Sequence, residues 1–510
     1  MSLRVFSEGD LQAIAAKGIH PTEILRQLEI FRRGVEPIKL IRPARIGDGI
    51  VQVIPEERNI LVSLHNQSVR RGRMLKFVPA SGAASRMFKD WQSCYRQGRF
   101  DSDESSVKFL QDIVKFPFYD DLKQIMASDG QNVEGYIHDK RCADILEYIL
   151  TPRGLNYAWL PKALLKFHIY PGHNRTAMEE HLVEAAFYIR DDRNICKIHF
   201  TISEEHESQF TDLLYRVKGT YENLFGVNYE VAVTIQFPST DTIATDMEGR
   251  PFREKNGKLL FRPGGHGALL QNLNTIDGDI IFLKNIDNVV PDPLKDITVF
   301  YKKVLGGYLV RLQDEIFQIL NLLCGRGVDD AGLSQIIRFC QKKLFMSFPE
   351  AFRNYSTSTR REYIFKKLNR PLRVCGMVRN EDEPGGGPFW IEETDGIQSL
   401  QIVEQNQIDL HSEEQKDIWR SSTHFNPVDL VCGVRNYRGD KFDLNLYANR
   451  NAVSISTKAH ENGELKGLEL PGLWNGSMAF WNTVFVEVPL ETFNPVKAVD
   501  DLLRKSHLPS

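Results

Sequence analysis

The spacing of apolar and polar positions changes along the chain. Over about the first 70 residues the pattern is polar with a helical period, which predicts a helical region. The apolar positions that set this period are Leu11, Ile14, Leu25, Leu28 and Phe31. At Met74–Pro79 (MLKFVP) it becomes a short, mostly apolar run, followed by small residues and then by helical spacing. This order predicts a strand, a tight loop and a helix, the opening of an α/β unit.

The same order of strand and helix recurs further along the chain. Three later apolar runs are predicted strands, at Ile198–Ile202, Tyr229–Phe237 and Asp279–Ile286, and the first is followed by a polar helical stretch. Strands that alternate with helices predict an α/β fold with a mixed, mostly parallel sheet covered by helices. Ligands of such sheets bind at the carboxyl ends of the strands.

Two segments interrupt this alternation and suggest where the chain divides. The pattern predicts a helical insertion at 102–157 and helices again over 301–369, and from Arg370 the chain is β-rich and rich in glycine. We therefore predict four parts. They are an N-terminal helical region (1–73), an α/β core (74–300), a helical insertion (301–369) and a β-rich C-terminal part (370–510).

Composition narrows the class of protein. Of 510 residues, 42% are hydrophobic and 26% charged, with 64 basic against 67 acidic side chains and a net charge of −3. This balance is globular and gives no support to a nucleic-acid partner. No apolar run is long enough to cross a membrane and the N-terminus lacks a secretory pattern, so we expect a soluble, cytoplasmic protein. The seven cysteines are scattered without a CxxC motif, which predicts buried, reduced thiols.

The small-residue loop after the first predicted strand is a candidate phosphate site. Its residues are Ser81, Gly82, Ala83, Ala84 and Ser85, with Arg86 directly after them. Small residues expose backbone N–H groups, a following helix N-terminus attracts anions, and a guanidinium adds charge. The alternative is an ordinary tight turn. The loop is not a Walker A motif, because it lacks the Gly-Lys-Ser/Thr ending.

Further candidates lie on other motifs. Lys162 follows Pro161 between apolar anchors and could act as a fixed positive charge, although most such lysines are solvated. Pro263–Gly267 (PGGHG) would let a flat base lie against the backbone, or would form a glycine-rich turn around a buried histidine. Asp287, after a strand, could hold Mg²⁺ against phosphates or cap a turn.

Two further candidate residues remain, one carboxylate and one lysine, together with three histidines. Glu404 could accept hydrogen bonds from sugar hydroxyls, or face water on an edge strand. Lys497, between an apolar strand and a helix-like segment, could meet a phosphate or lie at the surface. The histidines lack metal-ligand spacing, and we interpret them as structural or surface residues. They are His168, His173 and His181.

The order of these motifs resembles that of the UDP-sugar pyrophosphorylases, which are sugar nucleotidyltransferases with a GT-A-like, Rossmann-like fold. The family's Asn-Ile-Asp-Asn segment is matched letter for letter at Asn285–Asn288. The glycine-rich loop, the Pro-Lys pair, a Gln after a strand, the Pro-x-Gly-His-Gly motif and the C-terminal Pro-Val-Lys segment also have counterparts. The whole chain further resembles a bacterial family called domain of unknown function 4301.

The resemblance implies an Mg²⁺-dependent enzyme that joins a sugar 1-phosphate to a nucleoside triphosphate, with UTP preferred, and releases pyrophosphate. It implies a nucleotide-binding core at 74–300 and a sugar-binding part at 370–510. The implied catalytic residues are Arg86, Lys162 and Lys497. The implied nucleotide-binding residues are Ser81, Gly82, Ala83, Ala84, Ser85, Gln236, Gly265, His266 and Gly267. Glu404 and Asn426 would bind the sugar, and Asp287 and Asp429 the metal.

Two other functions remain open at this stage. A GT-A glycosyltransferase that consumes a nucleotide sugar would also need a metal-binding aspartate, but it has less phosphate for Lys162 and Lys497 to neutralise. A non-catalytic nucleotide-sugar-binding relative is favoured by Ala84, which stands where the family prefers glycine. The identity of the sugar and the oligomeric state are not indicated by the sequence.

Overall fold

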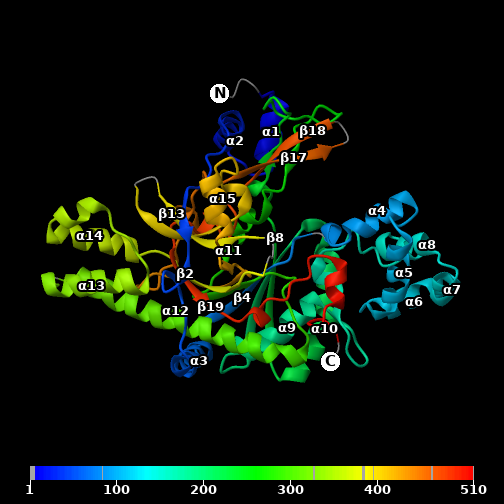
Figure 1. The fold of residues 1–510 in the computed structure, drawn as a ribbon, viewed down its shortest axis with the longest axis horizontal. Coiled ribbons are helices and arrows are strands. Elements are labelled where there is room, and N and C mark those ends of the chain that lie inside the picture. Colours follow the sequence, from blue (N-terminus) through cyan, green and yellow to red (C-terminus); the bar gives the residue numbers. More distant parts are fainter. Residues whose placement is uncertain are drawn as a thin grey trace. The chain divides into compact units, whose positions relative to one another are not determined.

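The computed structural model describes residues 6–82, 84–325, 328–381, 385–393, 396–460 and 463–508 (Figure 1). The described chain forms two compact units, each assembled from three separate stretches. Unit 1 comprises 6–68, 236–283 and 304–490, and unit 2 comprises 69–235, 284–303 and 491–508. Each unit is therefore completed by residues that are hundreds of positions apart in the sequence.

Unit 2 contains a parallel sheet of three strands in the order β4-β7-β8. The strands are β4 (Met74–Pro79), β7 (Ile195–Ile202) and β8 (Asn228–Ile235), and a short ribbon is formed by β5 (Lys166–His168) and β6 (Arg175–Thr176). Helices α9 (Ala177–Tyr188) and α10 (Glu207–Phe225) lie between them in the chain. β4 has the predicted bounds, because its apolar run ends abruptly at small residues. The predicted alternation of strand and helix is confirmed here.

The predicted insertion 102–157 is helical in the structure. Its helices are α5 (Asp103–Asp112), α6 (Tyr119–Ser128), α7 (Val133–His138) and α8 (Cys142–Leu150), and α4 (Lys89–Gln97) precedes them. An aromatic core joins them: the ring of Trp91 meets those of Phe109 and Phe116 edge-on, at centroid distances of 5.2 and 5.4 Å. Such edge-to-face contacts stabilise a core beyond the area that the rings bury.

Unit 1 contains a larger, mostly parallel sheet in the order β2-β3-β19-β12-β16-β11. β12 pairs in parallel with β19 and antiparallel with β16. The bounds are β2 (Arg45–Ile46), β3 (Gly49–Val51), β11 (Ile280–Lys284), β12 (Leu372–Arg379), β16 (Asp429–Gly433) and β19 (Asn482–Glu487), with β15 (His424–Phe425) paired to β12. The chain is thus α/β with largely parallel sheets, as expected.

Smaller sheets complete unit 1. One has the order β1-β13-β14, and two are hairpins. Their strands are β1 (Leu40–Pro43), β13 (Gly387–Glu392) and β14 (Gln398–Val403), β9 (Thr242–Ile243) with β10 (Phe261–Arg262), and β17 (Ser454–His460) with β18 (Gly463–Glu469). The β-rich character predicted after Arg370 is confirmed.

The N-terminal stretch forms α1 (Glu8–Ala16), α2 (Pro21–Arg33) and α3 (Pro55–Arg70). The five apolar positions that predicted these helices pack in one core cluster. The helical prediction was wrong at 40–51, which forms β1, β2 and β3. These short strands exist because β1 pairs with β13 and β3 with β19, partners more than 300 residues away that no local period reveals.

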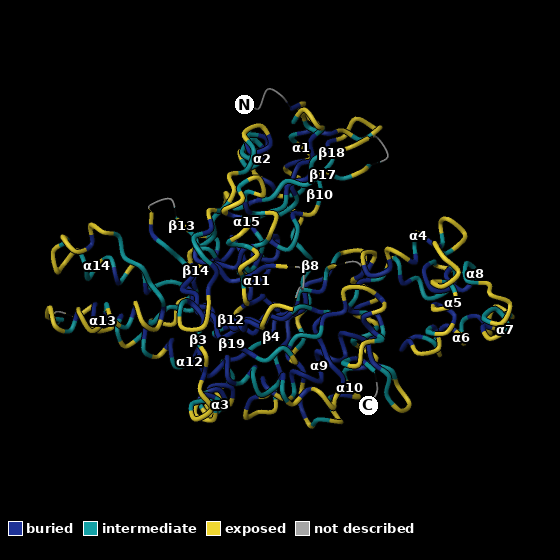
Figure 2. The backbone as a smooth tube through the Cα atoms, in the orientation of Figure 1, coloured by how far each residue is buried: buried dark blue, intermediate teal, exposed yellow. Residues whose placement is uncertain are grey.

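The remaining helices are α11 (Leu269–Thr275), α12 (Lys295–Cys324), α13 (Asp330–Lys343), α14 (Thr357–Leu368) and α15 (Glu413–Arg420), so the prediction of helices over 301–369 is confirmed. Among the helices that the structure describes, none combines the length and apolar character that a bilayer crossing requires. All seven cysteines are free thiols, five of them buried, while Cys142 is half-buried and Cys324 exposed. Figure 2 shows where the chain is buried.

Candidate functional site

The small-residue loop of unit 2 borders open space on one side. Gly82 is exposed, and a side chain placed there would meet no atom within 4 Å. Ala84 is fully buried, and its N–H donates to the carbonyl of Leu160 at 3.0 Å. That N–H is therefore already used within the protein, so the donors open to an anion lie elsewhere in the loop.

The rest of the loop differs from the expected geometry in one respect. A 3-10 turn, Ala84–Arg86, stands between the loop and α4, which begins only at Lys89. Ser81 is half-buried, whereas Ser85 and Arg86 are exposed. Within the described residues the Arg86 guanidinium has no ion pair. Ala83 lies outside the described residues.

Lys162 and Asp287 form the centre of the candidate site in unit 2. The Nζ atom of Lys162 lies 2.7 Å from Oδ2 of Asp287 and donates at 2.7 Å to the carbonyl of Val496. The two charged side chains are 14% and 19% exposed, so the pair is mostly shielded but still reaches solvent. Asp287 follows β11, and Lys162 opens a 3-10 turn after Pro161. The structure thus joins two predicted residues that are 125 positions apart.

The C-terminal segment is bound to both sides of this ion pair. The N–H of Val496 donates to the carbonyl of Asp287 at 3.0 Å, and that of Val499 donates to the carbonyl of Met87 at 3.1 Å. Lys497 lies between these two bonds and is exposed, with its Nζ 5.6 Å from the ring centre of Phe493. The segments that carry Arg86, Lys162, Asp287 and Lys497 therefore meet within unit 2.

The other predicted residues belong to unit 1, where His266 is the best-defined centre. Its ring stacks on Trp474 at 4.2 Å, and its Nδ1 accepts a hydrogen bond from the N–H of Leu473 at 3.1 Å. Burial lowers the pKa of His266 to about 4, so the ring is neutral near pH 7. Its Nε2 carries the proton and lies 3.8 Å from Oε1 of Glu404.

The glycines around His266 serve close packing within the chain. A Cβ on Gly264 would lie 2.5 Å from the carbonyl oxygen of Thr240, and one on Gly267 would lie 2.2 Å from that of Pro471. Gly265 has a φ of +72°. Any larger residue would force these backbones apart. The motif holds His266 in place, whether or not a base also lies against it.

The remaining predicted residues of unit 1 lie near strand ends. Glu404 follows β14, and burial together with the nearby Glu469 raises the pKa of its carboxyl group. Asn426 is buried, and its Oδ1 accepts from the N–H of Val428 at 3.1 Å. Asp429 is buried at the start of β16, and Gln236 is half-buried directly after β8.

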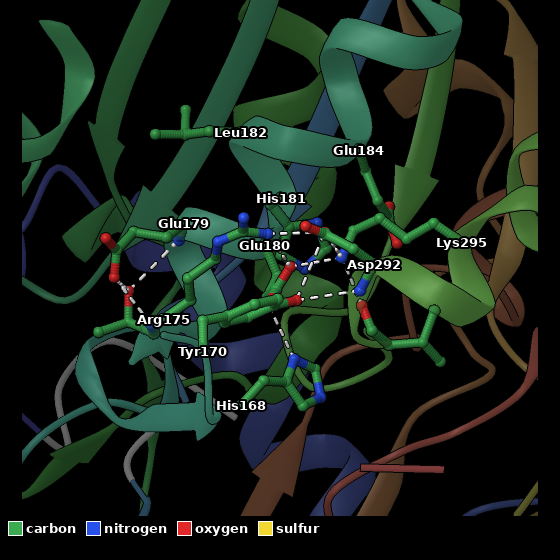
Figure 3. Close-up of polar contacts among 12 residues, drawn as sticks. His168, Tyr170, Arg175, Glu179, Glu180, His181, Leu182, Glu184, Asp292 and Lys295 are labelled. Atoms are coloured by element: carbon green, nitrogen blue, oxygen red, sulfur yellow. Dashed lines mark hydrogen bonds and ion pairs between the residues drawn. The ribbon is translucent and has the colours of Figure 1, made fainter. Parts of the chain in front are cut away.

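Sequence reasoning missed the buried charges that support the unit 2 site. Oε1 and Oε2 of Glu180, on α9, lie 2.8 Å from Nδ1 of His168 and 2.5 Å from Nζ of Lys295 (Figure 3). Tyr170 also donates to Glu180, at 2.9 Å, and Arg175 pairs with Asp292 at 2.6 Å. Burial alone would raise the pKa of Glu180, but the neighbouring cations lower it, so the carboxyl group is ionised.

A second buried cluster lies one turn further along α9. The carboxylate of Glu184 sits 2.9 Å from Nζ of Lys76 and 2.6 Å from Nζ of Lys284, all with side chains at most 1% exposed. His181, between the two glutamates, has its Nε2 3.1 Å from the carbonyl of Ile286. Burial lowers its pKa well below the usual range, so the neutral ring donates this bond. α9 therefore fixes the end of the strand that leads to Asp287. Of the three histidines predicted to be structural or surface residues, His168 and His181 are buried in these networks, and His173 is exposed and pairs with Glu179.

Little in the local sequence pattern indicates these contacts. Glu179, Glu180 and Glu184 resemble a solvated helix face, yet every one of them is buried. Trp474 lies in a loop without a motif of its own. The charge content of α9, three glutamates in 12 residues, is close to the 26% of the whole chain and gives no signal of its own.

Comparisons with known proteins give the following relations. A UDP-glucose phosphorylase of Trypanosoma brucei has 13% sequence identity and a TM-score of 0.47, and the match covers 97% of this chain and 77% of that one. The uridine diphosphate N-acetylglucosamine pyrophosphorylase of the same organism has 12% sequence identity and a TM-score of 0.48, and the match covers 98% of this chain and 79% of that one. The UDP-glucose pyrophosphorylase of Leishmania major has 12% sequence identity and a TM-score of 0.45, and the match covers 99% of this chain and 79% of that one. At this sequence identity and TM-score, structural similarity establishes neither the reaction nor the substrate of this chain.

No curated protein matches the chain. A family model does, over nearly its whole length. The model described as "Domain of unknown function (DUF4301)" matches residues 7–508, and the chain belongs to that family.

Proposed function

We propose that this protein is a sugar-1-phosphate nucleotidyltransferase, which joins a sugar 1-phosphate to a nucleoside triphosphate, UTP in preference, and releases pyrophosphate. One observation carries the proposal. Lys162 and Asp287 are paired at 2.7 Å beside the small-residue loop and the segment of Lys497. A polyphosphate needs such an arrangement of cations, open amides and one carboxylate. The motif order shared with UDP-sugar pyrophosphorylases supplies the reaction class, and with it we propose a GT-A-like fold.

The proposed reaction needs no protein nucleophile. A phosphate oxygen of the sugar 1-phosphate attacks the α-phosphorus of the nucleotide in line, and the bond to the β-phosphate oxygen breaks. Catalysis then depends on position and charge neutralisation. Arg86 and the open loop amides would hold the triphosphate. Lys162 and Lys497 would face the α-phosphate and the sugar phosphate.

The residues present could bind Mg²⁺ only if phosphate oxygens of the substrate supplied the other ligands. Among the described residues no group of three or more His, Cys, Asp or Glu side chains is arranged to hold a metal. Asp287 keeps Oδ1 clear of its bond to Lys162, and Mg²⁺ prefers one or two carboxylates plus substrate phosphates. When bound, the ion would withdraw charge from the phosphates. We propose Asp287 as its ligand in unit 2, and Asp429 of unit 1 stays a predicted metal ligand.

Unit 1 would receive the neutral parts of the substrates. Gln236, Gly265, His266 and Gly267 are proposed to contact the base and ribose, with neutral His266 as a hydrogen-bond donor. Glu404 and Asn426 are proposed to bind sugar hydroxyls. Because the Oδ1 of Asn426 already accepts from Val428, its amide NH₂ is the group that remains for a ligand.

The test is pyrophosphate release. Protein is incubated with Mg²⁺, UTP and one of several sugar 1-phosphates, and released pyrophosphate is measured against reactions that lack one substrate. We expect release only when both are present, and loss of release in Lys162→Met but not in Lys505→Ala, an exposed lysine of the C-terminal segment. Release by neither protein with any sugar 1-phosphate would refute the proposal.

One observation favours a second candidate, a non-catalytic nucleotide-sugar-binding relative. The N–H of Ala84 is bonded to Leu160, which removes one donor from the loop. Binding of nucleotide sugars without turnover would support this candidate. Transfer of sugar from a nucleotide sugar without pyrophosphate would instead support a GT-A glycosyltransferase.

A further inference from the structure

The C-terminal segment 491–508 has no α-helix or β-strand of its own in the described chain, yet it supplies two contacts to the candidate site. The carbonyl of Val496 accepts from Lys162, and its N–H donates to Asp287. Asn494 adds a third bond, from its N–H to Oδ1 of Asn288 at 2.9 Å. Buried side chains at Val496, Val499 and Leu502 pack the segment as far as Leu502, and the residues after it need a further anchor.

The anchor lies at the far end of the segment, at His507. This side chain is 2% exposed, and its ring stacks on that of His168 with 5.2 Å between centroids. The Nδ1 of His507 lies 2.9 Å from Nε2 of His168, whose Nδ1 in turn lies 2.8 Å from Oε1 of Glu180. Three buried polar side chains thus form a single line from the chain end to α9.

Only one arrangement of protons satisfies this line with neutral rings. Glu180 is ionised and can only accept, so Nδ1 of His168 carries a proton and donates to it. The Nε2 of His168 is then an acceptor, and Nδ1 of His507 must donate. A hydrogen-bonded line fixes direction and distance, whereas apolar packing alone would tolerate sliding.

The anchor His507 and Lys497 lie on the same short segment. Lys497 lies ten residues before His507, and the intervening 3-10 turn Val499–Leu503 is fixed by Asp501, whose Oδ2 accepts from the N–H of Lys497 at 2.7 Å. The segment is therefore held at Val496 on one side of Lys497, and at the turn and His507 on the other.

We propose that His507, acting through His168 and Glu180, is a positioning residue that holds Lys497 and the Val496 carbonyl at the phosphate site. The catalytic part of this inference rests on the proposed function. The anchoring part does not, because it concerns only how the C-terminal segment is bound.

The test uses two variants of the same side chain. His507→Phe keeps the ring and its stack but removes the donor, which leaves Nε2 of His168 without a partner. His507→Asn places an amide N–H close to the position of Nδ1 and keeps the donor. Both are made in the full chain and compared with Lys505→Ala. Amide hydrogen exchange of peptides that cover Asn494–Val499 reports anchoring, and pyrophosphate release reports positioning.

We expect exchange at Val496 and Val499 to be about tenfold faster in His507→Phe, the change expected when one buried hydrogen bond is lost. kcat should fall by a similar factor, with KM for the nucleotide within about twofold. His507→Asn should restore both. A purely structural role would not give this recovery or separate kcat from KM.

The outcomes distinguish the two parts. Unchanged exchange in His507→Phe overturns the anchor. Faster exchange with unchanged kcat overturns the positioning role. Absence of activity in the wild type refutes the proposed function, and exchange then still decides whether His507 anchors the segment.

Discussion

Glu184 offers the sharpest test of how the structure holds its candidate site. Its carboxylate is fully buried between the ammonium groups of Lys76 and Lys284, at 2.9 and 2.6 Å. Glu184→Gln keeps the size of the side chain but removes its charge, so two buried cations lose their only carboxylate within the described cluster. Breaking a buried ion pair in this way costs about 3–5 kcal/mol.

The structure places the expected cost at the lower end of this range. Burial already lowers the pKa of Lys76 to about 7, and the loss of Glu184 lowers it further. Lys76 can therefore lose its proton near pH 7, which reduces the buried charge left without a carboxylate. We expect a loss of about 3 kcal/mol, which for a unit of about 200 residues lowers Tm by about 6–12 °C.

The assay is thermal unfolding of purified variants at fixed pH. Glu230→Gln, an exposed glutamate on β8, is the matched control and should shift Tm by no more than about 1 °C. Adding Lys284→Met to Glu184→Gln removes the cation that lay 2.6 Å from the lost carboxylate and should recover at least half of the loss. If Glu184→Gln unfolds at the temperature of Glu230→Gln, the reasoning about this cluster is wrong.

The other predictions concern the candidate site. Asp287→Asn should abolish pyrophosphate release while Tm stays close to that of the wild type, and undiminished release would remove Asp287 from the site. Lys497→Ala should cost several kcal/mol of transition-state stabilisation, about that of one preorganised donor, whereas Lys505→Ala should leave kcat/KM unchanged. Burial lowers the pKa of His507 to about 3, so its contribution is fully present above about pH 6.5 and lost as the pH falls from there towards 3. Exchange protection of the C-terminal segment should decrease over that range, and constant protection would contradict the buried neutral ring.

The sequence predicts most where the structural cause is local. β4 has its predicted bounds because an apolar run ends at small residues. The strands at 40–51 were missed because their partners, β13 and β19, lie hundreds of residues away. Likewise, the motif order led to Lys162 and Asp287 but not to Glu180, which by its local pattern belongs on a solvated helix face and is in fact 0% exposed. Burial of a charge depends on tertiary partners, and no short segment contains them.

Equilibrium titration of UTP into the wild type and into Lys162→Met tests the central proposal most directly. The pair of Lys162 and Asp287 is proposed to lie where the phosphates bind, and without Lys162 the carboxylate would repel them. We expect UTP affinity to fall by at least about tenfold in the variant, while the affinity for uridine, which has no phosphate, stays the same. Equal UTP affinity in the two proteins would contradict a phosphate site at this ion pair.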